Sequence, residues 1–165
     1  MVNHEDHPRQ GIPDIVIVVI ILTAAVLVGC RLWLRDEQAA AQTASASDVE
    51  AVADVVQQLD GYVSTIFENY EITVSDDGKS VLLYLWKDGL AVDAAKAKNG
   101  IEPYASRWPE IVNNMQELSM TVQGLFDAAG LDVSASVCVR NDLSPEAVLL
   151  MTNKGSVILD AVSGS

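Results

Sequence analysis

One hydrophobic segment near the N-terminus, spanning residues 12–34, constrains this chain more than any other feature. Ile15 to Cys30 is a run of 16 residues without a charge, and three more apolar residues follow Arg31. At a rise of 1.5 Å per residue, a helix from Ile15 to Leu34 is about 30 Å long, the thickness of a bilayer's hydrocarbon core. Consecutive β-branched residues and the lack of a polar face argue against a buried helix of a soluble domain. The segment therefore predicts a single transmembrane helix.

The same segment also contains the pattern of a bacterial lipobox. Leu27-Val28-Gly29-Cys30 places small residues before a cysteine whose thiol would be lipidated after cleavage. A signal peptide should begin with a positive region, whereas residues 1–10 contain one arginine against two acidic residues. The chain also stays apolar after Cys30. We favour a permanent span and keep lipidation of Cys30 as the alternative, and both tether the protein to a membrane.

The orientation of the segment depends on residues just outside it. Arg31 and Arg35 outnumber Arg9, which by the positive-inside rule would leave the following domain in the cytoplasm. Residues 38–47, however, are almost wholly Ala, Gln, Thr and Ser, a composition that resembles the tethers of envelope domains. We expect an extracytoplasmic domain on a bacterial cell membrane. The expected organisation is a tail over residues 1–11, the span or signal over 12–34, a tether over 35–47 and a domain over 48–165.

Charge separates the domain from its anchor. The formal net charge of the chain is −13, and residues 1–35 carry equal numbers of acidic and basic side chains. The whole excess therefore belongs to the remaining residues. Such a surface repels nucleic acid and anionic lipid headgroups, so neither is an expected ligand of the domain.

Apolar periodicity predicts an α+β domain with a mostly antiparallel sheet of about five strands and two or three helices. Strict alternation over residues 131–140 predicts a strand with one face in water, whereas residues 81–86 are apolar on both faces and should form a strand that is central or covered on both sides. Short turns between strands favour antiparallel pairing. The expected helices cover residues 47–68, 90–98 and 109–129, and the expected strands cover 70–75, 81–86, 131–140, 147–152 and 157–162.

Residue types that carry catalysis or bind metals are sparse. His4 and His7 lie in the N-terminal tail without a fuller ligand set, and Asp76-Asp77-Gly78 fits a hairpin turn better than a calcium loop. The domain has no histidine, which removes the commonest general base, and no glycine-rich phosphate loop is present. Cys138 is expected to pack on a sheet face. We therefore expect no catalytic residues, no metal and no cofactor.

The connection over residues 101–109 is the most suggestive surface in the sequence. It places Tyr104, Arg107 and Trp108 within five residues, and these three types are enriched at binding hot spots. The structural alternative, which we favour, is that Trp108 fastens the following helix to the core. The first interpretation predicts an interaction surface, and the second predicts a large loss of stability when Trp108 is truncated.

The sequence as a whole favours a membrane-anchored binding module that docks another envelope protein, and not an enzyme. The alternative is a small membrane-tethered hydrolase that uses paired carboxylates, since carboxylate or lysine chemistry is all that a domain without histidine retains. A pair of acidic residues in a cleft would favour this alternative.

Overall fold

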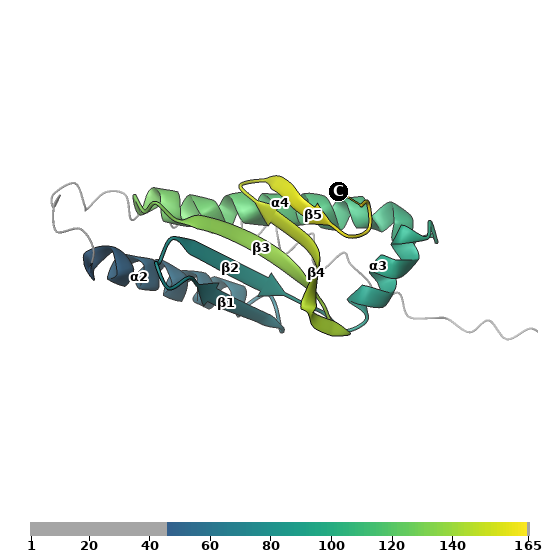
Figure 1. Ribbon diagram of the computed structural model, residues 1–165, viewed down its shortest axis with the longest axis horizontal. Helices are drawn as coiled ribbons and strands as arrows, with labels where there is room; N and C mark the ends of the chain where they lie inside the picture. The colour runs from purple at the N-terminus through teal and green to yellow at the C-terminus, as the bar shows by residue number, and fades with distance from the viewer. Residues whose placement is uncertain (1–45, 165) are drawn as a thin grey trace, which may run out of the picture.

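The computed structural model describes residues 46–164, which form an α+β fold of three helices and five strands (Figure 1). This confirms the predicted class and the number of strands. The helices are α2 (Ala46–Val63), α3 (Leu90–Lys98) and α4 (Tyr104–Ala128). The strands are β1 (Tyr70–Val74), β2 (Ser80–Leu85), β3 (Ser134–Asn141), β4 (Ser144–Asn153) and β5 (Ser156–Asp160).

The five strands form one mixed sheet in the order β1-β2-β3-β4-β5. Tight turns make β1–β2, β3–β4 and β4–β5 antiparallel pairs, as short connections favour. The pair β2–β3 is parallel, because the chain crosses back through α3 and α4 before it enters β3. The sheet is therefore mostly, but not wholly, antiparallel.

Helices α2 and α4 lie side by side against one face of the sheet (Figure 1). The strands turn alternate apolar residues toward these helices, and Leu83, Val137 and Leu150 are fully buried there. Leu59 of α2 and Phe126 of α4 are their counterparts from the helix layer. The main core therefore lies between the sheet and this pair of helices.

Two polar contacts connect α3 and α4 to distant turns. The carboxylate of Asp142, in the β3–β4 turn, accepts hydrogen bonds from the backbone N–H groups of Gly89 and Ala91, each at 2.7 Å. It thereby satisfies free donors at the start of α3. On α4, the Ser119 hydroxyl accepts the backbone N–H of Gly155 at 2.9 Å, which fixes the β4–β5 turn against the helix.

Several element boundaries differ from the expectations. Helix α2 ends at Val63, not near residue 68, and α4 begins at Tyr104, not at Pro109. Pro109 lies inside α4, where it cannot donate to a carbonyl, but the turn before it is still helical because Arg107 N–H donates to Pro103 O at 3.2 Å. Pro109 therefore lies within the first two turns of α4 and is not the first residue of the helix.

The expected wet face of residues 131–140 is confirmed at Asp132 and Ser134, which are exposed, but is wrong at the centre of the strand. Ser136 and Cys138 are buried, with exposed fractions of 6% and 2%. The reason is the central position of β3: on that face Leu82 and Tyr84 of β2 flank it on one side, and residues of β4 flank it on the other. The alternation of polar and apolar residues in one strand does not show which of its side chains the neighbouring strands bury.

The predicted tail, span and most of the tether, with Cys30, His4 and His7, lie outside the described residues. Of the helices between residues 46 and 164, none combines the length and the apolar character that a membrane crossing requires.

Candidate functional site

The sheet face opposite α2 and α4 carries apolar and aromatic side chains. Register aligns Tyr84, Cys138, Met151 and Leu159 in one row across four strands, with Glu71 of β1 at its end. Within residues 46–164, the helices lie on the other face or at the end of the sheet (Figure 1). We call this surface the open face. It carries Glu71, Leu82, Tyr84, Trp86, Cys138, Arg140, Met151 and Leu159, together with the polar side chains of Thr73, Ser136, Asn153 and Ser156.

Arg140 is the centre of the open face's polar contacts. Its guanidinium carbon lies 3.8 Å from the centroid of the Tyr84 ring and 5.7 Å from that of Trp86, both cation–π distances. Its Nη1 atom also pairs with the carboxylate of Glu71 on the edge strand. The parallel pairing of β2 with β3 brings these groups together. The planar guanidinium of Arg140 therefore contacts two aromatic rings of β2 and is paired with one carboxylate of β1.

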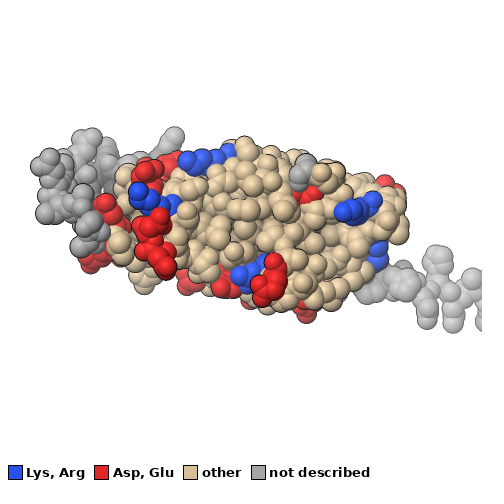
Figure 2. All heavy atoms as spheres, viewed as in Figure 1, with Lys and Arg blue, Asp and Glu red and all other residues tan. Residues whose placement is uncertain are grey.

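The surface over the strands carries few charges. In Figure 2, which views the molecule as in Figure 1, most of the central area is uncharged, and the acidic and basic side chains gather toward the periphery. Tyr84, Trp86 and Met151 are half-buried, and Leu159 is exposed. In a chain with a net charge of −13, a sheet face that has few charges and carries the aromatic side chains of Tyr84 and Trp86 is suited to contact with another protein.

Cys138 lies within this face but does not supply a nucleophile. Burial raises the pKa of its thiol to about 11, although the nearby Arg140 charge acts in the opposite direction. The thiol is therefore protonated near neutral pH, and only the thiolate is reactive. Cys138 packs on a sheet face, as the sequence predicts.

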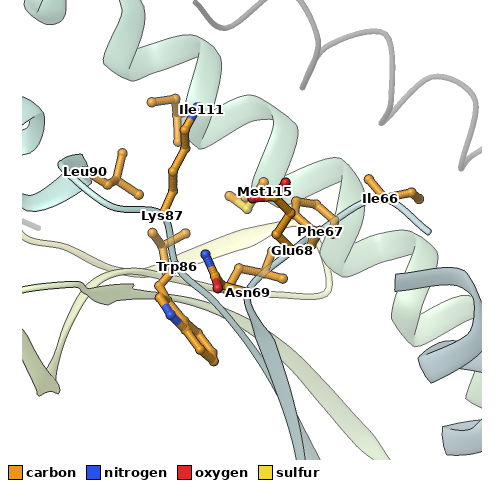
Figure 3. Close-up of a pocket in the computed structure, with 11 residues that line it drawn as sticks. Ile66, Phe67, Glu68, Asn69, Trp86, Lys87, Leu90, Ile111 and Met115 are labelled. Atoms are coloured by element: carbon orange, nitrogen blue, oxygen red, sulfur yellow. The ribbon is translucent and has the colours of Figure 1, made fainter. Parts of the chain in front are cut away.

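A pocket of about 430 Å³ lies at the end of the sheet, on the side where Leu85 and Val139 face the helix layer (Figure 3). Its walls are mainly apolar and come from the α2–β1 connection, from β2 and β3, and from α3 and α4. Over the described part of the chain, the ionisable side chains in its lining are Glu68 and Lys87. In Figure 3 the ring of Trp86 points away from the pocket's other labelled side chains, so Trp86 belongs to the open face and only borders the pocket.

The structure separates the three residues of the predicted interaction surface. Trp108 is 4% exposed and donates its indole N–H to Asp160 Oδ1 at 3.0 Å, so it packs into the core. Tyr104 is half-buried, with the Lys96 ammonium 4.2 Å from its ring centroid, and Arg107 is exposed. The side chains therefore do not present one continuous surface. The other predicted site, Cys30, lies outside the described residues.

Sequence reasoning missed the cluster of Tyr84, Trp86 and Arg140. These are again a Tyr, a Trp and an Arg, but more than fifty positions separate Arg140 from the two aromatic residues. A partial signal was present, because residues 82, 84 and 86 form the second apolar face of their strand. What the sequence did not show was the parallel pairing that places Arg140 beside them.

Neither metal chemistry nor a known relative explains the open face. Over the described part of the chain, no group of three or more His, Cys, Asp or Glu side chains is arranged to hold a metal ion. Comparison with protein-family models, with curated proteins and with solved structures finds no match to this chain.

Proposed function

We propose that this chain is a membrane-tethered binding module that docks a partner protein on its open face. The observation that carries the proposal is the contact of Arg140 with Tyr84 and Trp86 on a sheet face that also carries Leu82, Met151 and Leu159 and has no covering helix among residues 46–164. Rigid aromatic residues and a planar guanidinium bury much area at low entropic cost, which is why they dominate binding hot spots.

The uncharged segment before the domain supports the membrane location. Residues 15–30 are long and apolar enough to form most of a span, and the domain's negative charge disfavours contact with anionic headgroups. A tether of about a dozen small and polar residues would hold the domain away from the bilayer. We place the partner among the proteins of the bacterial envelope, with the domain on the outer side of the cell membrane.

A site-specific crosslinking experiment tests the docking surface. A photoreactive phenylalanine analogue replaces Leu159, which is 38% exposed and belongs to the open face without contributing to the Arg140 cluster. We expect one predominant crosslinked product in cells. The matched control places the analogue at Val92 on α3, which is 44% exposed, and should give no such product.

The Arg140 cluster is then altered in the Leu159 crosslinking background. Tyr84→Ala or Arg140→Ala should reduce the crosslinked product about tenfold or more, as truncation of a hot-spot residue does. Thermal unfolding of each variant shows whether the domain is still folded. A product that persists unchanged in both folded variants, or that forms equally from position 92, would refute docking at the open face.

A further inference from the structure

A groove separates α2 from the edge strand β1, on the helix side of the sheet and away from the open face. Its volume is about 540 Å³. Val52 and Val56 of α2 line one wall, and Ile72 and Val74 of β1 line the other. Val74 is 42% exposed, and Val49 at the start of α2 is 60% exposed although it also lines this groove. Apolar side chains are thus exposed at the end of the groove near the β1–β2 turn, and Val56 and Ile72 are half-buried further along it.

The backbone of β1 leaves hydrogen-bonding groups free beside this groove. Ser75 N–H donates to Ser80 O, and Trp86 N–H donates to Asn69 O, so the odd-numbered residues of β1 pair with β2. In an antiparallel ladder the intervening residues turn their N–H and C=O groups to the other side. These residues are Tyr70, Ile72 and Val74. No strand of the described chain pairs with that side, because β1 is at the edge of the sheet.

The same three residues direct their side chains toward α2. Tyr70, Ile72 and Val74 pair with Leu85, Leu83 and Val81, all of which face the helix layer. An added strand would therefore pair with their backbone while its own alternate side chains enter the groove. Strand β1 has five residues, which corresponds to about 17 Å of extended chain.

Charge indicates what kind of segment fits. Asp60 lines the groove near Tyr70, whose hydroxyl donates to Asp60 Oδ1 at 2.8 Å, and Asp76 lines the end near the β1–β2 turn. Among residues 46–164, no lysine, arginine or histidine lines the groove. A segment with basic residues at its two ends is therefore complementary, whereas an acidic segment would be repelled.

We propose that the α2–β1 groove binds an extended segment of a partner protein by strand addition to β1. The segment has small β-branched side chains at alternate positions and basic residues at its ends. This site is distinct from the open face, since its contacts come from the opposite side of the sheet and from the sheet edge, and it stands independently of the function proposed above.

The test uses the full-length chain in detergent micelles and a fluorescein-labelled heptapeptide. The peptide has valine at its second, fourth and sixth positions, serine between them and lysine at both ends. Its matched controls carry N-methylvaline at the central position, which removes a donor that faces β1, or glutamate at both ends. We expect each control peptide to bind at least about tenfold more weakly than the parent peptide. The N-methylvaline peptide loses a backbone hydrogen bond, and the glutamate peptide places negative charges near Asp60 and Asp76.

Two protein variants locate the binding. Val74→Arg places a charged side chain in the groove and should weaken peptide binding about tenfold, since it opposes both the apolar contacts and the terminal lysines. Val92→Arg, at a position of similar exposure on α3, should leave binding unchanged. Amide hydrogen exchange should slow at Tyr70, Ile72 and Val74 when the peptide is bound.

Three results would overturn the proposal. The first is equal affinity for the peptide with and without N-methylvaline. The second is equal weakening by Val74→Arg and Val92→Arg. The third is protection of β1 that rises with protein concentration in the absence of peptide, since a second copy of the chain would then be the occupant.

Discussion

At the scale of single residues, Gly155 shows how closely the β4–β5 turn approaches α4. Lys154 and Gly155 both have positive φ, at 48° and 77°, as a tight hairpin turn requires. A Cβ at Gly155 would lie 2.8 Å from Met120 Cγ. Gln116 Nε2 also donates to the carbonyl of Gly155 at 2.7 Å. The backbone conformation at this position therefore favours glycine, and a Cβ there would force the Met120 side chain to shift.

We predict that Gly155→Ala destabilises the domain by about 1–3 kcal/mol, because it combines left-handed strain with contact against Met120. Gly100→Ala is the matched control, since Gly100 has a φ of 71° and open space around it. It should cost only the backbone strain. Urea unfolding of the full-length chain in micelles measures the free energy of unfolding of both variants. Adding Met120→Ala should restore part of the stability that Gly155→Ala loses, but none of the stability that Gly100→Ala loses. Equal losses for the two glycines, without rescue, would show that the contact is unimportant.

Substitution of Trp108 separates a role in the core from a role in an interaction surface. Because it is 4% exposed and bonded to Asp160, we predict that Trp108→Ala costs about 3–5 kcal/mol of unfolding free energy, as large buried truncations do. Trp108→Phe keeps most of the apolar contact and should cost about 1–2 kcal/mol for the lost hydrogen bond. Denaturant unfolding measures both. Wild-type stability of Trp108→Ala with loss of a partner would instead restore the interaction surface predicted from the sequence.

Asp160 adds a pH dependence to this contact. Burial acts to raise the pKa of its carboxyl, but hydrogen bonds from the Ser163 hydroxyl, the backbone N–H groups of Ser163 and Val162, and the Trp108 indole outweigh it and lower the pKa. A carboxyl with a lowered folded-state pKa stabilises the fold above its ordinary value of 3.8 and loses that contribution as pH falls through the lowered pKa. We predict that the stability difference between wild type and Asp160→Asn is constant near neutral pH and shrinks below about pH 4. Acid titration of both proteins by circular dichroism checks this, and a constant difference down to pH 2 would contradict it.

At the scale of elements, local signals were predictable and long-range ones were not. The β1–β2 and β4–β5 hairpins and the end of α3 at Asn99-Gly100 depend on neighbouring residues, and each is confirmed. Parallel pairing of β2 with β3 depends on where α3 and α4 return the chain, and no residue in either strand encodes it. The cluster around Arg140 depends on that pairing, which is why the sequence suggested residues 104–108 instead.

The start of α3 depends on a side chain from another element. The Asp142 carboxylate accepts hydrogen bonds from the backbone N–H groups of Ala91 and Gly89. These hydrogen bonds lower the pKa of the Asp142 carboxyl, and the one from Ala91 has the larger effect. We predict that Asp142→Ala costs about 1 kcal/mol of stability, a typical value for loss of a capping side chain, and speeds amide exchange at Ala91. Asp132→Ala, on an exposed residue before β3, is the control. Unchanged exchange at Ala91 would show that the cap contributes nothing.

At the scale of the whole molecule, charge and hydrophobicity are segregated along the chain. Residues 1–35 balance their charges, and all of the net −13 belongs to the residues that follow. Surface carboxylates keep a domain soluble and repel it from anionic lipid. The two proposed binding surfaces, the open face and the α2–β1 groove, lie on opposite sides of the sheet and could be occupied together.

The fate of residues 12–34 determines how this domain is displayed, and one experiment separates the alternatives. A reporter active only outside the cytoplasm follows Ser165, with Cys30 retained or replaced by serine. From the length of the uncharged run and the composition of the tether, we predict that the reporter is active both with Cys30 and with Cys30→Ser. We also predict that both proteins keep the mass of the uncleaved, unlipidated chain, as a permanent span requires. A mass change that depends on Cys30 would establish lipidation after cleavage. Activity of a cytoplasmic reporter alone would instead put the domain on the inner side, where the Arg31 and Arg35 charges would favour it.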